Sequence, residues 1–388
     1  MKFLFRGISI FILDMKNLFT LLVLFLLVAS CKNEISRNST ILNVEIGNLP
    51  VDFKELKNDN LTFIPLNLPD SIFFGGIDHI KAYADMIFLH DEGQTNSLTI
   101  IDENGKFINQ LKKIGDGPGE YKSLDAFAYN ENEKILTIYD RSKFSLFHYK
   151  APSLEHISTY RLQKYIMNLE YVNDETIMIV SENEINEKGK YEGVMYISKE
   201  GKLLQDDLSI GNDVSSIELS YPNTVIKISD ITYYAHPHEL TTIYKMGNTA
   251  EPIYTIDFGK NKIPYKFWPV NKASEFEQSL TEGNKAVWVQ NIILNEENLA
   301  FSFLYKEFDT RYFYHQNFKD SSVHIYKGYT VSNSDYTLPH PIGSNGRNFI
   351  SLIYTENIDS TQFQNKEFLK TLRKSEGGGG YIIVKYKP

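Results

Sequence analysis

Four acidic side chains recur at similar places along the chain and are the residues best suited to hold a cation. Each comes just before or within a short apolar segment, one in each of four successive segments: Asp78, Asp125, Glu170 and Asp230. Carboxylate oxygens are the preferred ligands of Ca²⁺, so convergence of the four would create a calcium site. The alternative is that each carboxylate binds local backbone amides in a turn. We expect no other cofactor.

Histidine chemistry is a weaker candidate. The densest group is "AHPHEL", which holds His236, His238 and Glu239. A His-x-His pair on a strand would place both rings on one face, as a metal requires. However, Pro237 favours a turn or an edge strand, and no third ligand follows at a fixed spacing. We interpret the segment as a polar turn. A Gly-x-Ser-x-Gly nucleophile motif is also absent from the sequence.

An aromatic cluster gives the chain a candidate binding loop. Tyr265, Phe267 and Trp268 lie between Pro264 and Pro269, in a segment that interrupts the regular pattern of the chain. Exposed aromatic side chains can stack on sugars or anchor a peptide, and loops commonly carry function. Alternatively, these side chains plug a channel or cap a sheet.

The elements that must position these residues are short strands in repeated sets. Runs rich in Ile, Val, Tyr, Phe and Thr are separated by Asn, Asp, Gly and Lys turns, as in β-sheet proteins. The predicted hairpins centred on Asn104, Pro152, Glu200 and Asn248 lie 48 residues apart each time. A fifth hairpin, near Lys319, comes about 23 residues late, which matches an insertion at residues 261–285.

A fixed period of this size predicts an all-β protein, a β-propeller of six four-stranded blades over residues 59–388. Two short helices are predicted in insertions, at residues 273–280 and 362–373. A ring of blades must close to avoid open sheet edges. We therefore predict that "LTFIPL" (61–66) pairs beside the carboxy-terminal strands.

The stretch "GDGPGEY" contains several turn-forming residues between two predicted blades. Its motif residues are Gly115, Gly117, Pro118, Gly119, Glu120 and Tyr121. Glycine amides can bind an anion, but Asp116 and Glu120 disfavour phosphate, and we favour a structural inter-blade turn. The motif and the strands after it resemble the TolB-like six-bladed β-propeller lipoproteins of Gram-negative bacteria. The resemblance implies this fold and an envelope location, but it assigns no catalytic residues. Asp116 and the run Gly377–Gly380 depart from the usual pattern.

The amino terminus predicts export. Residues 15–31 run from a lysine through an apolar core to Val28-Ala29-Ser30-Cys31, which resembles a bacterial lipobox. We interpret residues 1–30 as a lipoprotein signal peptide, Cys31 as the lipidation site and residues 31–58 as a tether. A transmembrane anchor is the alternative, and Met15 is an alternative start. Lys32 after the cysteine, rather than aspartate, favours the outer membrane, facing the periplasm or the cell surface.

Charge argues against one class of partner. The chain has 40 basic and 49 acidic residues, and removing residues 1–30 leaves 37 and 48, a formal charge of −11. An acidic protein repels nucleic acid. We therefore favour a lipid-anchored, extracytoplasmic module that binds a small ligand or an envelope protein, over an enzyme. The alternatives are a cation-dependent hydrolase or lyase of the propeller lactonase type, and a scaffold in an envelope complex.

Overall fold

The computed structural model of the chain separates two compact units, Met1–Ser39 and Thr40–Pro388. The structure describes residues 39–46, 52–83, 86–181, 193–205, 225–228, 230–235, 242–263, 273–307, 310–332, 334, 336–346, 348–358, 366–375 and 380–387. All of the described helices and strands lie in the second unit. No helix within these ranges is long and apolar enough to cross a membrane.

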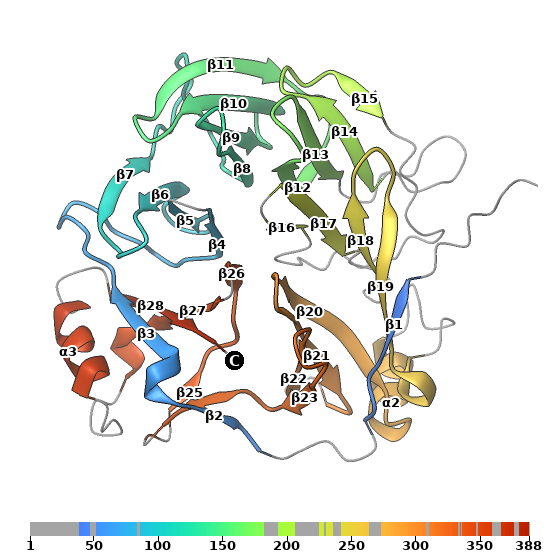
Figure 1. Cartoon of the computed structure of the whole chain (residues 1–388). Helices are drawn as coiled ribbons and strands as arrows, with labels where there is room; N and C mark the ends of the chain where they lie inside the picture. Colours follow the sequence, from blue (N-terminus) through green and yellow to red (C-terminus); the bar gives the residue numbers. More distant parts are fainter. Residues whose placement is uncertain are drawn as a thin grey trace, which may run out of the picture. The chain divides into compact units, whose positions relative to one another are not determined.

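The second unit is a β-propeller, whose sheets follow one another in a ring (Figure 1). Its first two blades are sheets of four sequential strands: β4 (His79–Ala82), β5 (Ile87–Asp91), β6 (Ser97–Ile101) and β7 (Phe107–Leu111), then β8 (Ala126–Asn130), β9 (Ile135–Asp140), β10 (Ser145–Lys150) and β11 (Glu155–Arg161). The next two comprise β12 (Ile166–Tyr171), β13 (Thr176–Ser181), β14 (Val194–Ser198) and β15 (Leu203–Gln205), then β16 (Val225–Ile228), β17 (Ile231–Ala235), β18 (Thr242–Met246) and β19 (Glu251–Asp257).

The remaining blades use strands from both ends of the chain. One comprises β20 (Ala286–Leu294), β21 (Asn298–Tyr305), β22 (Arg311–Asn317) and β23 (Val323–Tyr326). The smallest comprises β2 (Lys54–Leu56), β24 (Tyr329–Val331) and β25 (Thr337–Leu338). The last comprises β26 (Gly343–Asn345), β27 (Asn348–Tyr354), β28 (Tyr381–Tyr386) and β3 (Leu61–Pro65).

The structure has seven blades, so the prediction of six is wrong. The additional blade is the three-stranded sheet β2–β24–β25, in which β2 pairs with β24 in parallel. Its strands are only two or three residues long and come from distant parts of the chain, so it has no repeat unit of its own. Tyr329, Val331 and Leu338 nevertheless share a hydrophobic core with Phe313 of β22 and Phe349 of β27.

The 48-residue period marks the hairpins between third and fourth strands. Asn104, Pro152, Glu200 and Asn248 lie between β6 and β7, β10 and β11, β14 and β15, and β18 and β19, as predicted. The turn at 102–106 shows why these segments reverse direction. Asp102 accepts hydrogen bonds from the backbone of Asn104 and Lys106, and Gly105 takes the left-handed conformation, with φ of 81°.

Ring closure is also as predicted. Strand β3 pairs antiparallel with β28 over Leu61–Pro65, so an amino-terminal strand completes the carboxy-terminal blade. At the opposite edge of this blade, β26 contacts β4, the innermost strand of the first blade. Upstream, β1 (Thr40–Asn43) adds a parallel fifth strand to the sheet of β16–β19. In Figure 1 the three blue strands follow the lower rim of the unit, from β19 past β24 and β25 to β28.

Both predicted helices are present. In α2 (Ala273–Glu282), Phe276 and Leu280 are buried against Ile263, Val287 and Leu304. In α3 (Lys366–Ser375), Phe368 and Leu372 are buried, and the Phe368 ring meets Phe63 of β3 at 4.8 Å. The described residues also include the 3-10 helices η1 (Asn58–Asn60), η2 (Gly259–Asn261) and η4 (Thr355–Asn357). The helices thus cover blades without interrupting the ring.

Candidate functional site

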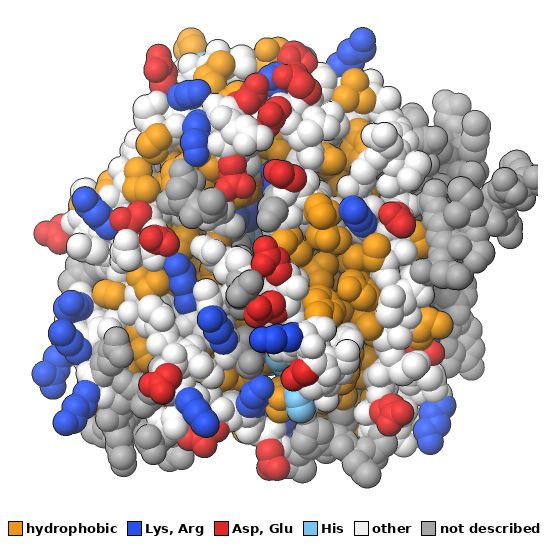
Figure 2. Space-filling model, in the orientation of Figure 1, with side chains coloured by type: hydrophobic (Ala, Val, Ile, Leu, Met, Phe, Trp, Pro, Cys, Tyr) orange, Lys and Arg blue, Asp and Glu red, His pale blue; other side chains and the backbone are white. Residues whose placement is uncertain are grey.

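A pocket lies where innermost strands of several blades meet. Residues of β4, β12, β16, β20 and β26 or its approach line it, and its volume is about 70 Å³, space for a few water molecules. Isoleucine provides most of the apolar wall: Ile80, Ile226, Ile292, Ile293 and Ile342. In the space-filling view, hydrophobic side chains gather over the region of β16 and β20, and charged side chains border them (Figure 2).

Lys81 and Glu170 form a buried ion pair in the wall of this pocket. Lys81 Nζ lies 3.1 Å from Glu170 Oε2, and their side chains are 18% and 3% exposed. The same ammonium group donates to the carbonyl oxygens of Phe127 (2.7 Å) and Leu169 (3.0 Å). One lysine of β4 therefore bridges β8 and β12, and its charge is fully compensated.

Tyr83 extends this network. Its hydroxyl donates to the Glu170 carboxylate at 3.3 Å and accepts the backbone N–H of Tyr129 at 3.2 Å. Burial first, and then the charge of Glu170, raise the pKa of the Tyr83 phenol well above its ordinary value. The Glu170 carboxylate also accepts the backbone N–H of Tyr171. Since Lys81, Tyr83 and this amide all engage the carboxylate, it is poorly placed to act as a general base.

Lys227 is the pocket's uncompensated charge. It lies on β16 and lines the pocket, and its ammonium group makes no hydrogen bond or ion pair with other residues that the structure describes. Ser344 of β26 adds a hydroxyl group to the lining. An ammonium group and a hydroxyl beside an isoleucine wall can bind a small molecule that has an anionic head and a hydrocarbon part.

The four candidate carboxylates do not converge. Asp78 precedes β4 and accepts the backbone N–H groups of Glu92 (2.9 Å) and Gly93 (3.1 Å). Asp125 precedes β8 and accepts the Ser123 hydroxyl and the Arg141 amide. By contrast, Glu170 lies near the end of β12 in the pocket, and Asp230 follows β16. Among the described residues, no group of three or more potential metal ligands includes any of these four carboxylates.

The segment 115–121 lies between β7 and β8 and satisfies its own polar groups. Gly117 donates its amide to the Glu120 carboxylate at 2.8 Å, and Lys143 donates to the carbonyl oxygens of Gly115 and Glu120. The buried Tyr121 hydroxyl donates to the Asn96 carbonyl oxygen at 2.8 Å. Pro118 and Gly119 complete the turn, in which Gly119 has φ of 71°. Because the Gly117 amide already donates to the Glu120 carboxylate, it is not available to bind an anion.

Other candidate residues lie outside the described residues. These are the lipobox cysteine, the aromatic loop and the histidine segment: Cys31, Tyr265, Phe267, Trp268, His236 and His238. Their assignments stay predictions.

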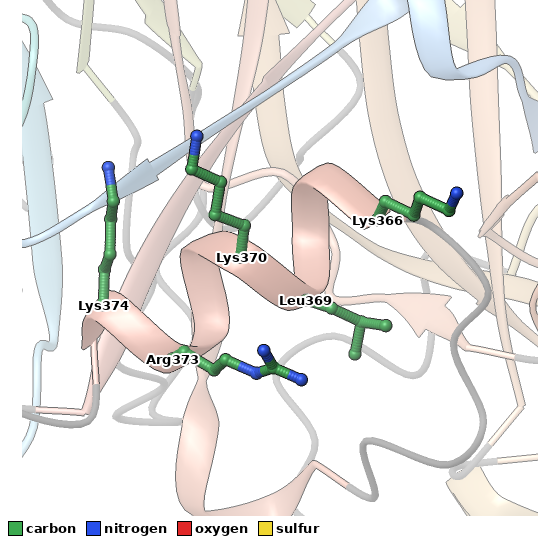
Figure 3. Close-up of a pocket in the computed structure, with 5 residues that line it drawn as sticks. All are labelled: Lys366, Leu369, Lys370, Arg373 and Lys374. Atoms are coloured by element: carbon green, nitrogen blue, oxygen red, sulfur yellow. The ribbon is translucent and has the colours of Figure 1, made fainter.

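A second surface feature is the basic side of α3. Lys366, Lys370, Arg373 and Lys374 line a surface depression together with Leu369 (Figure 3). In the close-up, Lys370 and Lys374 extend to one side of the helix and Arg373 to another. None of the four basic groups forms an ion pair with described residues. Four neighbouring cations on an acidic protein can attract an acidic partner.

Comparison with known proteins decides the family. A family model with the description "Domain of unknown function (DUF4934)" matches residues 40–387, nearly the whole second unit. The chain belongs to this DUF4934 family. The match supports a propeller family of unknown function, whereas the finer TolB-like resemblance is not confirmed. No curated protein matches the chain.

Of two similar solved structures, the first supports the fold of this DUF4934 protein. A "Putative exported protein" from Bacteroides fragilis NCTC 9343 is 16% identical, with a TM-score of 0.71, over 90% of this chain and 100% of that one. A member of the DUF4221 family from Bacteroides vulgatus ATCC 8482 is 10% identical, with a TM-score of 0.48, over 84% and 95% of the two chains. Neither description names a cofactor.

Proposed function

We propose that this DUF4934 protein is an exported, lipid-anchored β-propeller that binds a small organic anion at the pocket among its inner strands. The pocket carries this proposal, because it combines one uncompensated ammonium group with an apolar wall. The lipobox pattern and the likeness to an exported protein support the extracytoplasmic location. The proposal does not extend to hydrolase or lyase activity, because no metal-ligand group within the described residues includes the carboxylates that this hypothesis required.

The lining defines the class of ligand. Lys81 is neutralised by Glu170, so Lys227 supplies the net positive charge. A carboxylate would be held by Lys227 and Ser344, and a short branched hydrocarbon would contact Ile226 and Ile292. The small volume favours a head group with few carbon atoms.

Three matched probes test this assignment by ligand-observed NMR on the purified protein. Isobutyrate, isobutylamine and isobutanol share a branched hydrocarbon and differ in charge. We expect saturation transfer to isobutyrate, and little to the amine or the alcohol. Lys227→Met should abolish the isobutyrate signal, and Lys245→Met, on β18 of the same blade, should retain it. Equal signals from all three probes, or an unchanged signal in Lys227→Met, would contradict the proposal.

Location has its own test. If Cys31 is lipidated, Cys31→Ser should move the protein from the membrane fraction to the soluble fraction of cells. Membrane retention of the variant would argue for a different anchor.

A scaffold is the second candidate function, and the basic side of α3 favours it. An acidic envelope protein would complement Lys366, Lys370, Arg373 and Lys374. Cross-linking in cells should capture an acidic protein with the wild type, but not with Lys370→Glu/Arg373→Glu. Lys319→Glu, in the turn after β22, is the control. Sedimentation of the purified protein with anionic vesicles instead would identify a lipid surface as the partner.

A further inference from the structure

Two histidines and a glutamate come together at one end of the first blade. His79 begins β4, His90 lies on β5, and Glu92 follows β5 in the next turn. His79 and His90 are directly opposite each other in the antiparallel pair, so their side chains share one face of the sheet. Glu92 lies outside the strand, but its carboxylate reaches the same side, because it contacts the His79 ring.

The distances between these groups suit a metal ion. One potential ligand atom from each residue lies within 4.8 Å of the other two, and no other such group occurs among the described residues. His79 Nε2 lies 3.4 Å from Glu92 Oε2. Ligands about 2.0–2.1 Å from a tetrahedral zinc ion are roughly 3.3–3.4 Å apart, so this pair already has the required separation. The His79 and Glu92 side chains are 30% and 44% exposed and have room to adjust.

The His90 ring is fixed by a hydrogen bond to a backbone carbonyl oxygen, as the rings of metal-binding histidines commonly are. It is 1% exposed, and its Nε2 lies 2.8 Å from the Leu124 carbonyl oxygen. A carbonyl oxygen only accepts, so Nε2 carries the hydrogen atom. In the neutral ring, Nδ1 then keeps its lone pair and is the nitrogen that can bind a metal ion. Histidine ligands commonly donate their second N–H to a backbone carbonyl in this way.

The turn that carries Glu92 is also fixed. Asp78 accepts the amides of Glu92 and Gly93, and Asp91 accepts the amides of Gln94 (3.0 Å) and Thr95 (3.1 Å). The second carboxylate oxygen of Asp91 accepts the Gly75 amide at 2.6 Å. These bonds hold the backbone on both sides of Glu92, so its carboxylate is presented to the histidines by a rigid turn.

We propose that His79, His90 and Glu92 bind a divalent transition metal ion, zinc by the chemistry of its ligands, with one coordination position open to solvent. Two imidazoles and one carboxylate suit zinc, whereas calcium and magnesium require mainly oxygen ligands. Three protein ligands leave the fourth tetrahedral position for water or a ligand. The site is formed by β4, β5 and the next turn, apart from Lys227 and Ser344, so it is independent of the proposed function.

The test is zinc binding by the full chain, purified in detergent through a tag without histidine and dialysed against a chelator. Isothermal titration with zinc sulfate should show one equivalent bound. His79→Ala and Glu92→Gln should each weaken binding at least tenfold, and His324→Ala, an exposed histidine on β23, should bind as the wild type does. Because all variants retain Cys31, thiol binding would not distinguish them.

A second measurement separates coordination from folding. Cobalt(II) should give the visible absorption bands of a tetrahedral ion in the wild type and in His324→Ala, but not in His79→Ala. The thermal midpoints of the metal-free variants should match that of the metal-free wild type. Zinc binding that is unchanged in both His79→Ala and Glu92→Gln, or an absence of binding by the wild type, would overturn the proposal.

Discussion

At the residue scale, the ion pair between Lys81 and Glu170 is the contact with the largest expected effect. A buried carboxylate that loses its partner is costly, whereas an exposed ion pair contributes little. The Glu170 side chain is almost fully buried. Its partner Lys81, on β4, also donates hydrogen bonds to carbonyl oxygens of β8 and β12. The pair therefore fixes how the first three blades meet.

Lys81→Met should lower the free energy of unfolding by about 3–5 kcal/mol, because Glu170 keeps its charge without a counter-ion. Lys81→Met/Glu170→Gln should be more stable than Lys81→Met alone, since no charge is then left buried. Lys199→Met is the control: it breaks the more exposed pairs with Glu175 (2.9 Å) and Glu133 (3.1 Å) and should cost about 2 kcal/mol or less. Urea unfolding measures all three. A double variant less stable than Lys81→Met would contradict the argument.

His315 should make stability sensitive to mild acid. Its Nε2 bonds Asn298 Oδ1 at 2.8 Å, its Nδ1 is buried without a partner, and burial and then the charge of Lys54 lower its pKa from 6.5 to about 4. The unfolded state then binds more protons between pH 6.5 and 4, so stability falls as the pH falls through this window.

The full shift corresponds to about 3 kcal/mol. His315→Gln should therefore flatten the decline in the free energy of unfolding between pH 6.5 and 4, measured by urea titration at several pH values. Parallel curves for the variant and the wild type would show that His315 does not titrate as the burial of its ring implies.

At the element scale, the inter-blade turn at 115–121 depends on backbone conformation. Gly119 has φ of 71°, and a Cβ atom at this position would meet His156 Cγ at 2.6 Å and Cβ at 2.7 Å. Gly119→Ala therefore combines the cost of a left-handed residue with a steric clash. Gly259 has φ of 52° with nothing within 4 Å, so Gly259→Ala carries the conformational cost alone.

We expect Gly119→Ala to cost roughly 2–4 kcal/mol and Gly259→Ala about 1 kcal/mol. Thermal and urea unfolding of the two variants would compare them directly. Equal losses of stability would mean that His156 moves aside freely and that the turn tolerates a side chain.

The elements that the sequence predicts well are those whose partners are near in the chain. The hairpins at Asn104 and Asn248 follow from turn residues and a fixed period. The pocket cannot be predicted in this way. Lys81 and Lys227 lie on short strands, and a lysine on a short strand suggests a side chain that faces solvent. Their positions depend on which blades become neighbours. The His-x-Glu spacing of His90 and Glu92 is visible in the sequence. The third proposed ligand, His79, lies on another strand, so the spacing alone does not reveal it.

At the scale of the whole propeller, the same distinction explains the blade count. The closing strand was predictable because a ring must pair its free edges, and "LTFIPL" precedes the first repeat. The seventh blade was not predictable, because β2 and β24 are separated by most of the chain and are three residues long. Long-range pairing therefore determines both the number of sheets and the integrity of the ring.

Closure through β3 and β28 can be tested by a cross-link. Thr62 and Lys385 are direct partners in this antiparallel pair, and neither side chain is buried. With Cys31→Ser to remove the native thiol, Thr62→Cys/Lys385→Cys should form a disulfide on oxidation and raise stability by roughly 2–4 kcal/mol. Thr62→Cys/Lys387→Cys is the control, because positions two residues out of register are about 7–8 Å apart, beyond the reach of a disulfide. Mass spectrometry of free thiols and melting under oxidising and reducing conditions provide the readouts.

Cross-linking of the control pair but not of the direct pair would mean a different register. Cross-linking without stabilisation would mean that the ring is already closed in the unfolded ensemble or that opening this blade does not limit unfolding.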